Sequence, residues 1–471
     1  MKKVKPFMVA LSAVLAASFL AACEQPAAPG TATAQTAAPA AEVISEPTAA
    51  PALPLRILQT AEGGLSAGKD GAYLYDYVND SDAMVATAID FSDGVQRVLC
   101  DKPGCTHSDE SCPAWVYTFD PHGWGAEFAL FCDGDTLYWV KDGRFIENQF
   151  DPTAEAFIDA SNLDGSNRRR IVSGTDIPDL HSAFNDDVLA DDNAIYFIKR
   201  NYGEGLQGET DLYRLDKGTN VFTTVHLGSG PDGAPLYMAG VWRDKLIMQQ
   251  VSTLIPLERP TGDATEEEWA TYETGVREGQ KTQGNEIIAV ATDGTRSGPL
   301  AAWVAEELLG SAVGTDDGWY SVRAGSGDLE RTDLLTGEQT TLAPALAPGA
   351  RSVRIYPVAR NKLLVDATAP ETFNESRFVV DPAGGETRAL DATWSKLGST
   401  SARVPFIYAN NGTSLLMQVA TLPYMAHTID QDGVEQTYQS EKVQLAVLPL
   451  ADYLGGSTDW TNCTFIGRFN T

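Results

Sequence analysis

Short apolar segments separated by turn residues recur along most of the chain. Each segment opens on a turn rich in Asp, Asn and Gly, which leads into a run of aromatic and aliphatic residues, and the openings are spaced by roughly 45–75 residues. This pattern predicts an antiparallel meander in each unit. The seven openings lie at residues 69–71, 133–135, 191–193, 243–244, 316–318, 360–361 and 411–412.

Most units also carry a second turn that contains Gly, placed before a Thr-rich or Arg-rich return strand. These turns lie at residues 92–94, 163–165, 216–218, 292–294, 335–337 and 383–385. Asp-Gly and related pairs accept the positive φ of tight hairpins. Because one meander cannot bury both of its faces, the units must pack against one another. We predict an all-β fold, a β-propeller of seven blades. Six and eight blades are the near alternatives, and a tandem of β-sandwiches is the other fold with this pattern.

Two segments depart from the strand pattern. Thr265 and Glu268 have the spacing of a capping box and precede Trp269 and Tyr272. They predict a short surface helix in an insertion near residues 261–284, within the fourth unit. A second helix is predicted over residues 299–309, which are rich in Ala and Leu and end at Gly310.

The first residues have the parts of an export signal. Lys2, Lys3 and Lys5 precede an apolar run over residues 7–20 that is short for a membrane span. The sequence Leu-Ala-Ala-Cys that ends at Cys23 has the form of a lipobox. We therefore expect residues 1–22 to be a lipoprotein signal peptide and acyl chains on Cys23 to hold the protein at the cell membrane, facing outside the cytoplasm. An ordinary secretory signal with a chance cysteine is the alternative.

The composition changes once the leader ends. Residues 24–54 are almost wholly Ala, Pro and Thr, so with Cys23 they form a predicted disordered tether, and residues 55–471 form the predicted propeller. With 43% apolar residues among 471, the chain as a whole is not disordered. Its formal charge of −30 makes nucleic acid and anionic lipid surfaces poor partners.

A loop in the first unit, residues 100–112, has the most specific chemistry. Cys100, Cys105, His107 and Cys112 can form a tetrahedral Cys₃His site, for which structural zinc is the ordinary occupant. Disulfides are the competing prediction, since thiols outside the cytoplasm tend to pair. With Cys132 and Cys463 the number of cysteines beyond the leader is odd, so one thiol would remain. Reduced thiols in an anaerobic setting are the third alternative.

The lipobox, the tether, the Cys-x4-Cys-x-His-x4-Cys loop and the Tyr-rich units together resemble surface lipoproteins of gut-dwelling Gram-positive anaerobes. Their propeller is similar to that of Tol-associated periplasmic proteins. The resemblance covers nearly the whole chain, and its specific parts are the lipobox and the four loop residues Cys100, Cys105, His107 and Cys112. It implies a propeller fold and a membrane anchor, and it implies no activity.

No catalytic motif stands out around the five histidines. The aromatic residues that follow the cysteine loop, Trp115, Tyr117 and Trp124, are the candidates for a ligand platform, although buried rings that fill a blade interface explain the same pattern. The basic run Arg168, Arg169 and Arg170 predicts a solvated strand end, with anion binding as the alternative.

Three functions fit these observations. The first is a non-catalytic binding module for a glycan, peptide or protein, displayed on a lipid anchor. The second is a propeller-type hydrolase or lyase that acts on extracellular polysaccharide, which requires three or more Asp, Glu or His side chains to converge. The third is a cell-envelope assembly scaffold, which requires a large exposed apolar patch. The sequence leaves it open whether the protein is an enzyme.

Overall fold

The structure is a computed structural model, and within residues 54–465 it describes most of the chain. The predicted signal peptide and nearly all of the predicted tether, including Cys23, lie outside the described residues. The gaps within the range are 60–64, 78–82, 119–126, 143–144, 147–148, 151–155, 181–182, 184–186, 204–206, 232, 252–259, 261–263, 360, 397–398 and 430–434.

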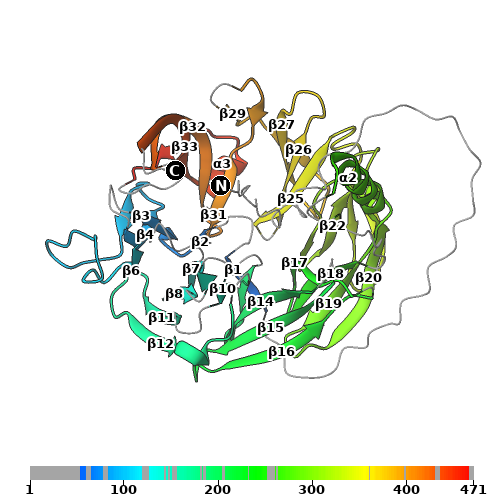
Figure 1. The fold of residues 1–471 in the computed structure, drawn as a ribbon. Coiled ribbons are helices and arrows are strands. Elements are labelled where there is room, and N and C mark those ends of the chain that lie inside the picture. Colours follow the sequence, from blue (N-terminus) through cyan, green and yellow to red (C-terminus); the bar gives the residue numbers. More distant parts are fainter. Residues whose placement is uncertain are drawn as a thin grey trace, which may run out of the picture.

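The first three sheets lie at the start of a ring of β-sheets (Figure 1). The first sheet contains β2 (Ser66–Ala67), β3 (Gly71–Tyr77), β4 (Ala83–Asp90), β5 (Gln96–Val98) and β6 (Trp115–Thr118). The second contains β7 (Glu127–Asp133), β8 (Thr136–Asp142), β11 (Phe157–Asn162) and β12 (Arg169–Ser173). The third contains β13 (Val188–Ala190), β14 (Ala194–Tyr202), β15 (Gly208–Asp216), β16 (Phe222–Gly228) and, beside β13, β1 (Arg56–Gln59).

An eight-stranded sheet and two further sheets complete the ring. The eight strands are β17 (Tyr237–Trp242), β18 (Lys245–Val251), β19 (Gly284–Ala291), β20 (Arg296–Val304), β21 (Val313–Thr315), β22 (Gly318–Val322), β23 (Leu329–Thr332) and β24 (Gln339–Ala343). The next sheet contains β25 (Ser352–Ala359), β26 (Lys362–Thr368), β27 (Glu375–Val380) and β28 (Thr387–Leu390). The last contains β31 (Phe406–Asn410), β32 (Ser414–Ile429), β33 (Glu435–Pro449) and β34 (Thr461–Asn462).

The remaining elements of the described chain lie outside these six sheets. Two hairpins stand apart from the main sheets, β9 (Phe145–Ile146) with β10 (Gln149–Phe150) and β29 (Trp394–Ser395) with β30 (Ala402–Arg403). The helical elements are α2 (Glu266–Lys281), α3 (Leu450–Leu454) and the 3₁₀ turns Gly174–Asp176 and Ala305–Glu307. None of these helices has the length and apolar character that a membrane crossing requires.

The all-β propeller fold is confirmed, and its sheets divide differently from the prediction. Five separate sheets of four or five strands are accompanied by the eight-stranded sheet, in place of seven separate blades. That sheet is two four-stranded meanders joined at one parallel pair, Gly240 with Gly314. The predicted seven units are therefore found when the two halves of the eight-stranded sheet are counted separately.

The predicted hairpins fall where the strands require them. All seven opening turns lie between the first and second strands of a four-stranded unit, and all six closing turns lie between the third and fourth. Glycines with positive φ occupy many of them, such as Gly134 at 59° and Gly337 at 72°. Local turn chemistry therefore determined the register of the meanders.

The apolar core is divided among the contacts between consecutive units. One cluster joins the first and second sheets around Trp139, and another joins the second and third around Phe131 and Phe197. A further cluster joins the last sheet to the first through residues that include Leu74 and Leu416. Each unit thus buries its faces against its two neighbours, which is the radial packing that a propeller requires.

The ring closes by backbone contacts between its first and last sheets. Val95 and Thr464 form an isolated parallel bridge, and the amide of Leu65 donates to the carbonyl of Tyr408 at 2.6 Å. The N-terminal strand β1 instead pairs with β13 of the third sheet. Figure 1 shows β1 nearer the centre of the ring than β15 and β16.

The helix prediction near residues 261–284 is confirmed, and the second one is wrong. The Thr265 hydroxyl accepts from the amide of Glu268 at 3.2 Å, while the Thr265 amide donates to the Glu268 carboxylate at 2.7 Å, so the predicted capping box precedes α2. Residues 299–304 belong to strand β20, and residues 305–307 form only a 3₁₀ turn. As an edge strand, β20 tolerates Pro299, which has no amide to donate to a further strand.

The junction of the two meanders requires glycine at residue 240. Its φ is 138°, and a Cβ atom there would lie 2.3 Å from the carbonyl oxygen of Gly314. We expect Gly240→Ala to lower the free energy of unfolding by about 1–3 kcal/mol through steric overlap, in addition to backbone strain. Gly337→Ala is the control, because Gly337 also has positive φ but open space around it. Urea unfolding curves of the two variants measure the difference, and equal losses would contradict the proposed overlap.

Candidate metal centre and ligand pocket

The cysteine loop connects β5 to β6 through a series of tight turns. The amide of Cys105 donates to the carbonyl of Lys102 at 3.2 Å, across the Pro103-Gly104 corner where Gly104 has φ of 72°. The amide of Cys112 donates to the carbonyl of Asp109 at 3.0 Å, and His107 has φ of 58°. The loop is therefore folded on itself, with its four candidate ligands turned toward one point.

The four candidate ligands form one compact group. The sulfurs of Cys100, Cys105 and Cys112 and a ring nitrogen of His107 all lie within 4.8 Å of one another. His107 Nδ1 is 3.2 Å from Cys112 Sγ. In a tetrahedron with Zn–S bonds of about 2.3 Å, neighbouring sulfurs lie about 3.8 Å apart, so the spacing suits such an ion. The structure thus brings together the four residues that the sequence singled out.

The described cysteines form no disulfide with one another, and the choice between a metal and disulfides in this loop stays a prediction. The five described cysteines are free, including Cys132 and Cys463. Cys132 lies in β7, where its amide donates to the Ser66 hydroxyl at 2.9 Å and its sulfur is 3.4 Å from the same oxygen. Cys463 is buried in the contact between the last and first sheets. Neither lies in the compact group.

The local environment shifts the pKa values of Cys112 and Cys105 in opposite directions. Burial raises the pKa of Cys112 to about 12. At Cys105, desolvation is outweighed by a hydrogen bond from the His107 amide and by the neighbouring thiols, so its pKa lies below the ordinary value. Burial lowers the pKa of His107, which favours the neutral imidazole that metal ligation needs. The donor set of three thiols and one imidazole fits a metal of the zinc type.

Arg168 ties the end of the loop to the second sheet. Its guanidinium donates to the carbonyls of Pro113 at 2.9 Å and Trp115 at 3.0 Å, and it lies 4.1 Å from the centre of the Trp139 ring. Arg168 and Arg170 both pair with Asp159, a buried carboxylate. The predicted solvated strand end is therefore wrong for Arg168, which holds the first two sheets together, whereas Arg170 is exposed and pairs with Asp159 within the second sheet.

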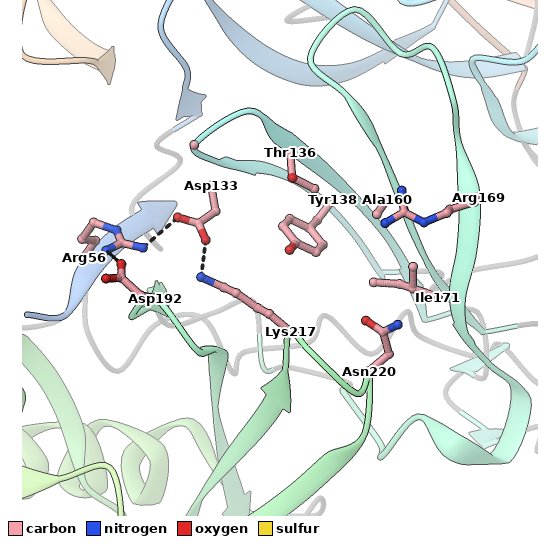
Figure 2. Close-up of a pocket in the computed structure, with 11 residues that line it drawn as sticks. Arg56, Asp133, Thr136, Tyr138, Ala160, Arg169, Ile171, Asp192, Lys217 and Asn220 are labelled. Carbon is pink, nitrogen blue, oxygen red and sulfur yellow. Dashed lines mark hydrogen bonds and ion pairs between the residues drawn. The ribbon is translucent and has the colours of Figure 1, made fainter. Parts of the chain in front are cut away.

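A polar cavity of about 430 Å³ opens between the second and third sheets. Figure 2 shows Arg56 of β1 paired with Asp133 and Asp192, and Lys217 paired with Asp133. The Arg56 to Asp192 distance is 2.7 Å, and Lys217 also donates to the carbonyl of Asp191. Burial alone would lower the pKa of Arg56, but the hydrogen bonds and charges of Asp192 and Asp133 together outweigh it, so the pKa is raised above its ordinary value. One end of the cavity is thus closed by ion pairs.

The opposite side of the cavity carries polar groups of a different kind. Figure 2 places Tyr138 of β8, Arg169 of β12 and Asn220 of the β15–β16 turn around the opening, with no interaction drawn between them. Burial raises the pKa of Tyr138, the charge of Asp133 raises it further, and the charge of Arg169 opposes both. The Tyr138 hydroxyl is therefore a neutral donor that faces the cavity.

The predicted aromatic platform does not line this cavity. Trp115 is half-buried in β6 and packs against the cluster between the first two sheets, as the alternative prediction for the aromatic residues stated. The backbone of Tyr117 lies in β6, while its side chain is not among the described ones, and Trp124 lies outside the described residues. Sequence reasoning missed the cavity. Its signal was present in part, because Asp133 and Asp192 belong to opening turns of adjacent units.

The described residues contain no second group of potential metal ligands as compact as the cysteine loop. Within the described residues, the cysteine loop is the one group of three or more His, Cys, Asp and Glu side chains whose ligand atoms lie this close together. His226 is exposed and pairs with Asp211 at 2.8 Å. Such close spacing is what a bound metal needs, whereas the two carboxylates of a glycoside hydrolase lie about 5–9.5 Å apart, so the lyase or hydrolase alternative stays a prediction.

Several solved structures are similar to this chain at low identity. An oligogalacturonate lyase from Vibrio parahaemolyticus is 10% identical, with 87% of this chain and 86% of that chain covered and a TM-score of 0.39. The polysaccharide lyase Uly1 is 11% identical, with 82% and 90% covered and a TM-score of 0.42. An oligogalacturonate lyase in complex with manganese is 14% identical, with 68% and 72% covered and a TM-score of 0.37. No protein-family model and no curated protein matches the sequence.

Proposed function

We propose that this chain is a lipid-anchored, extracytoplasmic β-propeller that acts as a non-catalytic binding module, with a structural zinc ion in its cysteine loop. The observation that carries the proposal is the cavity between the second and third sheets. Its ion pairs fix one side, while Tyr138 and Arg169 face the opening with donors that no protein group takes up in the described structure. Such a site is typical of ligand binding, with a glycan or a peptide as the ligand.

The donor set of the loop supports a structural metal. Cys100, Cys105, His107 and Cys112 supply four protein ligands, and a tetrahedral ion with four protein ligands has no position left for water or substrate. Zinc bound there would fix the loop that connects β5 to β6, and through Arg168 it would hold that loop against the second sheet.

The anchor is supported by the sequence around Cys23. We expect the wild-type chain, expressed in a bacterium that processes lipoproteins, to incorporate labelled fatty acid and to sediment with membranes. Cys23→Ala should remain soluble and unlabelled, because no other cysteine follows a lipobox. Recovery of the Cys23→Ala chain in the membrane fraction to the wild-type extent would show that Cys23 is not the anchor.

The binding role is tested by a screen of the soluble Cys23→Ala chain against arrays of glycans and short peptides. We expect at least one class to bind with a dissociation constant in the range of about 1 μM to 1 mM. Recovery of the bound compounds unchanged in mass supports a non-catalytic role. Turnover of a bound glycan, or the absence of binding to every class, would overturn the proposal.

A further inference from the structure

The charges that line the cavity are not balanced. Three cations, Arg56, Arg169 and Lys217, face two carboxylates, Asp133 and Asp192. Arg56 pairs with both carboxylates, and Lys217 pairs with Asp133. The two carboxylates therefore have their partners, and Arg169 is left over. This surplus positive charge lies on a chain whose formal charge is −30.

Arg169 is directed to the cavity by the alternation of its strand. Arg168 and Arg170 lie on the other face, where both pair with Asp159. Successive side chains of an extended segment point to opposite faces, so Arg169 lies on the cavity side, as Figure 2 shows. Within the described chain it has no hydrogen-bond acceptor and no ion-pair partner, although a guanidinium has five N–H donors.

Other polar and apolar side chains line the cavity beside Arg169. The Tyr138 hydroxyl faces the same opening, and the Asn220 side chain lies across from it. Ile171 and Ala160 supply an apolar wall, while Thr136 adds another hydroxyl. A guanidinium beside hydroxyl and amide donors matches the planar oxygens of a carboxylate, to which arginine can donate two parallel hydrogen bonds.

We infer that this cavity binds a ligand through a carboxylate held by Arg169 and Tyr138. The inference deepens the proposed binding function, on which it rests, by naming the chemical class of the ligand. One unpaired cation matches one negative charge, whereas a doubly charged phosphate would also meet the nearby Asp133 and Asp192. The volume of about 430 Å³ is larger than a carboxylate needs, so the ligand extends beyond it as an acidic sugar or a peptide end.

Matched pairs of ligands test the inference on the soluble Cys23→Ala chain. Glucuronate against glucose represents the sugar source, and N-acetylalanine against its amide represents the peptide source. We expect the acid of at least one pair to bind tenfold or more tightly than its neutral counterpart by calorimetry. The pair with the larger ratio identifies the source, and inorganic phosphate should bind more weakly than that acid.

Variants of the arginine run provide the control. Arg169→Gln should remove the preference for the acid, and Arg169→Lys should restore part of it because charge remains but the paired geometry is lost. Arg170→Gln makes the same change of charge one residue away, on the opposite face, and should retain the preference. Circular dichroism and melting temperature establish that each variant is folded.

The outcomes separate this inference from the binding function. If a ligand from the screen is neutral and its affinity is unchanged by Arg169→Gln, the binding function stands and the carboxylate inference fails. The inference also fails if neither acid is preferred, or if phosphate binds more tightly than both acids in a manner that depends on Arg169. If no ligand of any class binds, the binding function itself is overturned.

Discussion

Replacement of Arg377 by methionine is expected to lower the free energy of unfolding by about 3–5 kcal/mol. The side chain is 1% exposed and donates to Asp366 at 2.6 Å, to the carbonyl of Pro405 at 2.7 Å and to the Tyr453 hydroxyl at 2.6 Å. Removal of the guanidinium leaves the Asp366 carboxylate buried without its cation. The measurement is the midpoint of urea unfolding, followed by tryptophan fluorescence.

A surface pair on the same sheet is the matched control for this prediction. Lys362 pairs with Asp381 at 2.8 Å, and both side chains are more than a quarter exposed. Lys362→Met should change stability by about 0–1 kcal/mol, because water screens the pair. The double variant Arg377→Met with Asp366→Leu should recover much of the loss, since it leaves no unpaired charge. Equal effects of Arg377→Met and Lys362→Met would show that the buried network contributes little.

The position of Arg377 explains why this effect should be large. Asp366 lies on β26 and Arg377 on β27, whereas Pro405 precedes β31 and Tyr453 belongs to α3. The Tyr356 hydroxyl of β25 also joins the network through Asp366 and Arg377. A single buried cation thus connects two consecutive sheets of the ring. Burial raises the pKa of Tyr356 well above its ordinary value, so this hydroxyl stays neutral.

The sequence predicted those features of the fold that depend on neighbouring residues. Asp-Gly turns identified the hairpins because positive φ is a local requirement, and the Thr265 to Glu268 spacing identified α2 because a capping box is local too. Residues 299–309 were misassigned for a related reason. An apolar, Ala-rich segment suits a helix by propensity, but here it completes a sheet as the edge strand β20.

The candidate metal centre was predictable and the cavity was not, and the difference is one of sequence distance. The four candidate metal ligands lie within one loop, so their spacing alone indicated a site. The cavity takes Arg56 from β1, Asp133 from the second sheet and Lys217 from the third. Only the ring brings these residues together. The arginine run also could not be interpreted from sequence alone. Arg168 and Arg170 pair with Asp159, so Arg169 is the one residue of the run that lines the cavity.

Loss of the metal site in the cysteine loop is the second change for which we expect a large effect on stability. We expect the purified wild-type chain to contain one zinc ion per molecule and Cys105→Ser to contain none. Zinc at about 1,000 times its dissociation constant would stabilise the folded chain by about 4 kcal/mol, and this contribution should be lost in the variant and after chelation. Metal analysis and the melting temperature, with and without chelator, measure the two effects. Thr106→Ala is the control, because Thr106 is exposed in the same loop and is not one of the four candidate ligands.

Thiol reactivity distinguishes bound metal from the disulfide alternative. Cys132 and Cys463 are buried, so a thiol reagent should reach neither in the folded protein. With zinc bound, the thiols of Cys100, Cys105 and Cys112 should also resist the reagent until chelator is added, when three should become reactive. Two disulfides with one remaining thiol would show no such increase and would contradict the metal site. Because four protein ligands close the coordination of the ion, its removal should loosen the loop without abolishing any chemical step.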